Sequence, residues 1–218
     1  MTELAHAKPA GTPHQESATR RDFLTIAGTA VAAIGAAVAV WPLIDTMNPS
    51  ADVLAAGAPI DIDLSHLQAG QQIIVLWRSR PVFIVKRAPD SLKTLQDPKD
   101  LSLLRDPDSN ALQQPEYAKN WHRSIKPDVL VLVGICTHLG CIPNFMPAPG
   151  SLDASWLGGY FCPCHGSRYD LAGRVYSGVP APNNLPVPPY RFVSDKVIRI
   201  GENPEGAANF DLNSVEQI

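Results

Sequence analysis

Two short segments of the chain concentrate the side chains that are best suited to bind a transition metal. Residues 136–141 have the sequence CTHLGC, and residues 162–167 have the sequence CPCHGS. Together they contain all four cysteines and two of the six histidines of the protein. Thiolate and imidazole groups are the ligands that zinc and iron–sulfur centres use. We therefore expect the two segments to meet as loops and to hold a redox metal centre.

Three kinds of site are compatible with this set of side chains. A structural zinc ion would take four of the six candidate groups in a tetrahedral arrangement. Two disulfides would use all four cysteines and leave the histidines uninvolved. A [2Fe–2S] cluster with two cysteine and two histidine ligands would leave two cysteines, which pair readily outside the cytoplasm. The two motifs alone leave these alternatives open.

The N-terminal part of the chain predicts export and a membrane anchor. Residues 1–22 form a polar tail that ends in a twin-arginine pattern, TRRDFL at residues 19–24, as in Tat signals. Residues 23–44 contain no charge, and a helix of that length is about 33 Å long, enough to cross a bilayer core of ~30 Å. We interpret it as a retained single transmembrane helix rather than a cleaved signal peptide, with a cytoplasmic N-terminus. Because Tat exports folded proteins, this signal suits a cluster that is inserted before export and gives no reason for zinc.

The remaining residues predict a linker followed by a β-domain. Residues 45–58 are small and polar, which is typical of a flexible hinge. Within residues 59–218, alternating apolar residues begin at Ile60, and two apolar strands, 129–135 and 158–161, lead directly into the two metal-binding motifs. The domain is thus expected to be mostly β and antiparallel. A net charge of −3 provides no basic surface for nucleic acid.

Short helices are expected between these strands. One is predicted to be capped by Ser91, and a second to begin at Pro98 or Asp100 and to end at Leu104. A hairpin is predicted around residues 78–81.

The two motifs resemble those of the Rieske iron–sulfur proteins of the quinol–cytochrome c oxidoreductase (cytochrome bc1) family. The resemblance extends to ADVLA at residues 51–55, to LRDP at 104–107 and to PAPNNL at 180–185, so it covers most of residues 20–200. It implies an antiparallel Rieske-type β-sandwich head behind a single transmembrane helix. Two departures are visible: the stretch 142–161 is longer than in many members, and Val179 separates the glycine from the Pro-Ala-Pro sequence. Neither departure involves a ligand.

The resemblance also implies a role for each side chain of the two loops. One pair of cysteines binds the first iron, one pair of histidines binds the second, and the other two cysteines form a disulfide: Cys136 with Cys162, His138 with His165, and Cys141 with Cys164. Ser167 and Tyr169 match the hydroxyl groups that donate to a cluster sulfur and to the sulfur of Cys136. Two neutral imidazoles in place of thiolates raise the potential from about −400 mV to between about −150 and +300 mV.

The activity implied by the resemblance is oxidation of ubiquinol at the outer membrane face. His165 would accept a hydrogen bond and then a proton from ubiquinol, and the head would move on the 45–58 linker to reduce cytochrome c1. Cytochrome b and cytochrome c1 would be the partners in a dimeric complex of the bacterial inner membrane, with the head in the periplasm. Alternatives are the small Rieske subunit of arsenite oxidase and a zinc-stabilised, non-redox domain. A Rieske oxygenase would need a catalytic domain, for which the chain is too short.

Overall fold

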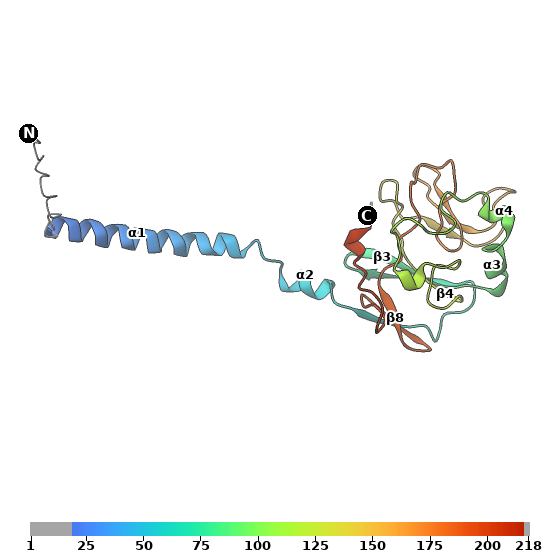
Figure 1. Cartoon of the computed structure of the whole chain (residues 1–218), viewed down its shortest axis with the longest axis horizontal. Helices are drawn as coiled ribbons and strands as arrows, with labels where there is room; N and C mark the ends of the chain where they lie inside the picture. The colour runs from blue at the N-terminus through green and yellow to red at the C-terminus, as the bar shows by residue number, and fades with distance from the viewer. Residues whose placement is uncertain (1–18, 216–218) are drawn as a thin grey trace, which may run out of the picture. The chain divides into compact units, whose positions relative to one another are not determined.

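The computed structural model describes residues 19–215, and most of the predicted polar tail lies outside the described residues. The chain forms two compact units, which divide between Ser50 and Ala51 (Figure 1). The first unit contains one long helix, and the second contains all the strands.

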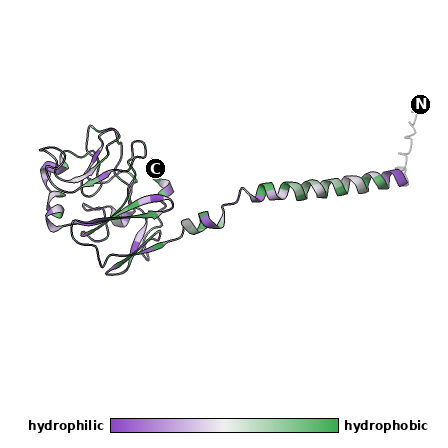
Figure 2. Ribbon diagram, turned by 180° about the vertical axis from the view of Figure 1, so that it is seen from behind, coloured by the Kyte–Doolittle hydropathy of each residue, from purple (hydrophilic) through white to green (hydrophobic). Residues whose placement is uncertain are grey.

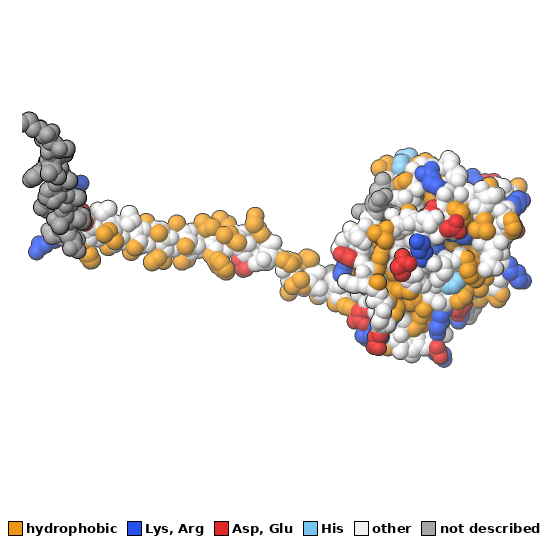
Figure 3. All heavy atoms as spheres, viewed as in Figure 1, with side chains coloured by type: hydrophobic (Ala, Val, Ile, Leu, Met, Phe, Trp, Pro, Cys, Tyr) orange, Lys and Arg blue, Asp and Glu red, His pale blue; other side chains and the backbone are white. Residues whose placement is uncertain are grey.

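The long helix α1 (Arg20–Asp45) includes the whole of the predicted span 23–44. It begins three residues earlier because Thr19 and Asp22 form a capping box, in which each side chain accepts a hydrogen bond from the other residue's backbone N–H. Hydrophobic residues follow its first turn, and apolar side chains cover its surface (Figures 2 and 3). Among the described residues, it is the one helix long and apolar enough to cross a membrane.

The second unit begins with a short helix in the segment expected to be a linker. Helix α2 (Ala51–Ala56) lies within residues 45–58, and only residues 46–50 connect it to α1. The strand β1 (Ile60–Asp63) follows, with Ile60 and Ile62 half-buried and the two aspartates exposed, as the alternation predicts.

Three antiparallel sheets of three strands each form the second unit. Their strands, in spatial order, are β1–β9–β8, β2–β3–β4 and β5–β6–β7. The bounds not yet given are β2 (Gln72–Trp77), β3 (Arg80–Lys86), β4 (Val129–Val133), β5 (Asn144–Met146), β6 (Gly159–Phe161), β7 (Arg168–Tyr169), β8 (Tyr190–Ser194) and β9 (Val197–Ile200). The predicted antiparallel β-domain behind one apolar helix is confirmed.

The core is centred on the strand pair β3–β4. Every residue of β4 is buried, and the register places Phe83 opposite Leu132. Such continuous apolar runs fit strands that are covered on both faces. The same core extends to the aromatic rings of Tyr160 and Tyr169 and to both free cysteines, so the metal-binding loops start from the packed core of the domain.

The short helices differ in part from the prediction. Helix α3 (Pro89–Thr94) is not capped by Ser91, because Pro89 occupies the first helical position and Ala88 precedes it without a side-chain bond. Helix α4 (Pro98–Leu101) does begin at Pro98, behind an Asp97 cap, but ends before Leu104. The remaining short elements are the 3-10 turns η1 (Glu116–Ala118) and η2 (Leu212–Ser214).

The hairpin β2–β3 has a tighter turn than expected. Its two turn residues, Arg78 and Ser79, have φ angles of 51° and 59°, and β3 already begins at Arg80. Pro81 is the second residue of β3, so the position that lacks a backbone N–H lies near the start of the strand.

Candidate metal centre

The two metal-binding loops follow directly from strands. Strand β4 leads through Gly134 to Cys136, and β6 ends one residue before Cys162. Gly134 is required because a Cβ atom there would overlap the ring of Phe83. The predicted apolar strands before both cysteines are confirmed, but β4 ends at Val133, two residues earlier than the predicted 129–135, and β6 begins at Gly159 rather than at 158.

Both loops are closed by the same pattern of backbone hydrogen bonds. The N–H of Cys136 donates to the carbonyl of Cys141 at 2.7 Å, and the N–H of Cys162 donates to the carbonyl of Ser167 at 2.8 Å. The fifth residue of each loop donates in turn to the carbonyl of the first cysteine, at 3.0 Å in both loops. The chain therefore presents two loops of equal length and closure.

A glycine makes each closure possible. Gly140 and Gly166 have φ angles of 81° and 79°, in the left-handed region that side chains with a Cβ adopt only with strain. The glycine in the HLGC part of the first motif and in the CHGS part of the second is therefore required by the backbone conformation.

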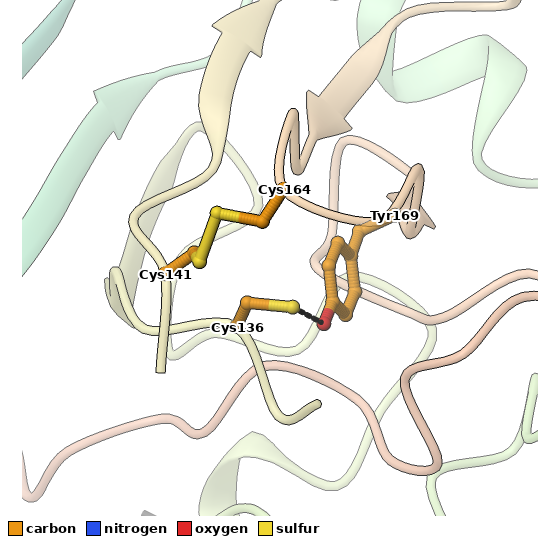
Figure 4. Close-up of a disulfide and its surroundings, with 4 residues drawn as sticks. All are labelled: Cys136, Cys141, Cys164 and Tyr169. Atoms are coloured by element: carbon orange, nitrogen blue, oxygen red, sulfur yellow. Dashed lines mark hydrogen bonds between the residues drawn. A yellow bond between two sulfur atoms is a disulfide. The ribbon is translucent and has the colours of Figure 1, made fainter. Parts of the chain in front are cut away.

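A disulfide joins the two loops. Cys141 and Cys164 are bonded, as the resemblance implied (Figure 4). The sulfurs of Cys141, Cys162 and Cys164 all lie within 4.8 Å of one another. This trio is not a metal site, because two of its sulfurs are used in the disulfide.

The other two cysteines are buried free thiols. Cys136 and Cys162 are each 2 % exposed. Burial raises the pKa of the Cys162 thiol, the nearby Cys136 adds to the increase, and the backbone N–H groups of Cys164 and His165 oppose it. A metal reverses this balance, because a coordinated thiol is deprotonated outright. The pair therefore suits two thiolate ligands on one metal ion.

The two loop histidines lie against each other. The ring centroids of His138 and His165 are 4.8 Å apart, and the ring planes are nearly perpendicular at 87°. The Nδ1 atom of His138 is buried and has no hydrogen-bond partner within the described chain. An unsatisfied buried nitrogen is costly, and coordination of a metal would satisfy it. His165 is exposed, so its ring can reach solvent or a partner.

Two hydroxyl groups match the predicted hydrogen-bond donors, and one of them contacts a candidate ligand directly. The hydroxyl of Tyr169 lies 3.2 Å from the sulfur of Cys136 (Figure 4). It also accepts a hydrogen bond from the backbone N–H of Thr137 at 3.2 Å. Burial raises the pKa of Tyr169, so the hydroxyl keeps a proton to donate. The oxygen of buried Ser167 accepts from the N–H of Ala181 at 3.1 Å, which leaves the Ser167 proton free to donate.

The proline loop, residues 177–189, is hydrogen-bonded to both metal-binding loops. Thr137 donates its hydroxyl proton to the carbonyl of Asn183 at 2.7 Å, and Ala181 anchors the loop on Ser167. The sequence analysis did not single out Thr137. Its position between two ligands in CTHLGC was the available signal, but its partner lies 46 residues away.

A buried ion network, also missed from the sequence, supports the turn after Tyr169. Arg174 pairs with Asp170 at 2.6 Å, and both side chains are almost completely buried. Tyr176 donates to Asp100 at 3.1 Å, and burial, with the neighbouring Asp170 charge, raises the pKa of Asp100 to about 7. The network ties α4 to the segment that carries Tyr169.

Comparisons with known proteins agree with this geometry. Residues 99–190 match the family model described as Rieske [2Fe-2S] domain, and residues 11–50 match the model described as ubiquitinol-cytochrome C reductase Fe-S subunit TAT signal. A ubiquinol-cytochrome c reductase iron-sulfur subunit of Allochromatium vinosum is 50% identical over 188 residues, covering 84% of this chain and 89% of the relative. The corresponding subunit of Rhodospirillum rubrum is 47% identical over 206 residues, covering 92% and 100%.

Among solved structures, a chain of a hyperthermophilic respiratory Complex III is 28% identical with a TM-score of 0.42, covering 79% of this chain and 98% of that chain. A cyanobacterial plasma membrane Rieske protein from Synechocystis is 19% identical with a TM-score of 0.38, covering 65% and 97%.

The two strand-delivered loops, their disulfide and the matched domain model define an iron–sulfur protein of the Rieske class. Identity of about half over most of both chains specifies it further. The chain belongs to the family of ubiquinol–cytochrome c reductase iron–sulfur subunits, and its cofactor is a [2Fe–2S] cluster.

Proposed function

We propose that Cys136 and Cys162 bind one iron of the cluster and that His138 and His165 bind the other. The observation that carries this assignment is the buried Nδ1 atom of His138, which has no protein partner within the described residues. The two buried thiols support it, and the disulfide removes the remaining cysteines from competition.

The function of the chain is electron transfer from quinol to a cytochrome within quinol–cytochrome c oxidoreductase. The cluster supplies a one-electron acceptor whose potential is high because two of its ligands are neutral imidazoles. The hydroxyls of Tyr169 and Ser167 stabilise added negative charge by donating hydrogen bonds, and so raise the potential further.

His165 is the proposed contact with ubiquinol. Its exposed ring nitrogen accepts a hydrogen bond from the quinol hydroxyl and then its proton. Leu139, in the first loop, and Ile142, directly after it, are 71% and 54% exposed, so the first loop offers apolar side chains to a partner. Exposed apolar side chains of this kind suit a partly apolar pocket in which cytochrome b holds the other side of the quinol.

The anchor and the linker determine where this chemistry occurs. Helix α1 anchors the chain in the bacterial inner membrane with its N-terminus in the cytoplasm, and residues 59–218 form the periplasmic head. Residues 45–58 act as the hinge on which the head moves from cytochrome b to cytochrome c1, in a dimeric complex. Within this hinge, α2 is only six residues long, so it can lengthen or unwind at low cost.

Co-purification tests the assignment to this complex. Membranes are solubilised in mild detergent, and the chain is then captured through an affinity tag. The subunits that accompany it are identified by mass spectrometry. We expect cytochromes b and c1, together with ubiquinol-dependent reduction of cytochrome c. A molybdenum-containing arsenite-oxidising subunit in their place would contradict the proposal.

A further inference from the structure

The arginines of the second unit differ in whether they have partners. Seven have a hydrogen-bond or ion-pair partner: Arg87, Arg105, Arg123, Arg168, Arg174, Arg191 and Arg199. The other two are Arg78 and Arg80, at the β2–β3 turn. Neither has a carboxylate partner anywhere in residues 19–215.

These two arginines face the short helix α2 across a notch of ≈570 Å³. Val53, Leu54 and Ala58 supply an apolar wall, and no acidic side chain lines the notch. Leu54 is 64% exposed and is therefore free to contact a ligand. The notch combines two uncompensated cations with an apolar surface.

The position of Arg78 is held by neighbouring groups. Its guanidinium lies over the ring of Trp77, 4.6 Å from the ring centroid. Trp77 is buried and donates a hydrogen bond to the carbonyl of Ala58 at 3.0 Å. One indole ring therefore contacts both the arginine side and the apolar side of the notch. A Cβ atom on Gly57 would lie 3.9 Å from Nε of Arg78, which places the guanidinium over the end of α2.

The backbone of the β2–β3 turn is strained for the residues that it contains. A two-residue turn with both φ angles positive favours Asn and Gly, whereas this turn contains Arg78 and Ser79. A left-handed conformation is strained for a residue that has a Cβ atom. A long cation in such a strained position points to a role for the side chain rather than for the turn.

We propose that the notch binds the headgroup of an anionic phospholipid. A guanidinium matches the two free oxygens of a phosphodiester, and the apolar wall suits the glycerol backbone and the first acyl carbons. The five residues 46–50 between α1 and α2 reach at most about 20 Å when extended. If α1 is the membrane anchor, as the proposed function requires, headgroups of the same bilayer are within reach of the notch.

Lipid titration of the full chain tests this inference. The cluster-containing protein in detergent is titrated with dioctanoyl phosphatidylglycerol, dioctanoyl phosphatidylcholine and inorganic phosphate, and bound molecules are counted by native mass spectrometry. We expect saturable binding of phosphatidylglycerol. Arg78→Gln/Arg80→Gln should weaken it about thirtyfold, since each cation contributes ≈1 kcal/mol. Arg78→Lys/Arg80→Lys, which keeps the charge but not the planar fork, should give an intermediate value.

A matched control removes two other cations. Lys99→Gln/Lys119→Gln deletes the same charge from exposed positions outside the notch and should leave binding unchanged. Equal affinity for phosphatidylcholine, equal affinity for inorganic phosphate, or equal loss in this control would overturn the proposal. The proposal is also overturned if Arg78→Gln/Arg80→Gln still binds the lipid but loses co-purifying subunits. In that case the two arginines would bind an acidic protein surface instead of a lipid headgroup. The EPR signal of the reduced cluster is recorded on each sample, so failure of the proposed function is detected separately.

Discussion

Replacement of Tyr169 by phenylalanine tests how the protein sets the potential of its cluster. The hydroxyl lies 3.2 Å from the sulfur of Cys136, a distance at which an O–H group donates to a thiolate. A hydrogen bond to a charged group contributes about 1.5–3 kcal/mol. Only the part gained on reduction affects the potential, because the bond exists in both redox states. We take this part as about 1 kcal/mol, which corresponds to a decrease of roughly 40 mV for one electron.

The assay is a redox titration of the full chain, followed by EPR at constant pH. Tyr160→Phe is the matched control, because the Tyr160 hydroxyl is equally buried but has no hydrogen-bond partner in the described chain. We expect a lower potential in Tyr169→Phe and an unchanged potential in Tyr160→Phe. A wild-type potential in Tyr169→Phe, or equal shifts in the two variants, would refute the role assigned to the hydroxyl.

Four further predictions follow from the same geometry. Ser167→Ala should lower the potential by a similar amount and slow quinol oxidation; an unchanged redox titration would contradict this. Cys141→Ser removes the disulfide and should cost about 3 kcal/mol, measured by thermal unfolding with loss of the EPR signal. Several prolines within 51–58 should slow turnover and leave the cluster spectrum intact; unchanged turnover would argue against a moving head. The folded state keeps a proton on Asp100 up to about pH 7, and the unfolded state releases it near 3.8, so stability should fall as the pH rises between these values. Asp100→Asn should flatten this dependence in denaturant titrations, and an identical pH profile would be evidence against it.

The sequence predicted the chemistry of the site better than its surroundings. The two motifs contain every proposed ligand, and the apolar strands before Cys136 and Cys162 follow from local patterns. Local preference also explains the error at Ser91, because a proline two residues earlier competes for the helix start.

What the sequence could not reveal depends on contacts between distant segments. Thr137 finds its acceptor on Asn183, and Arg174 is buried against Asp170 while donating to the carbonyl of Leu95, 79 residues away. No periodicity encodes such partners. The orphaned nitrogen of His138 is likewise visible only when its surroundings are packed around it.

The central claim is that two histidines and two cysteines of this chain bind a [2Fe–2S] cluster. Pulsed EPR of the reduced full chain, prepared with ¹⁵N-labelled histidine, tests it most directly. We predict coupling of the unpaired electron to two histidine nitrogens, and loss of the signal in His138→Ala and in His165→Ala. A colourless protein that contains zinc, or an EPR signal without nitrogen coupling, would contradict the account.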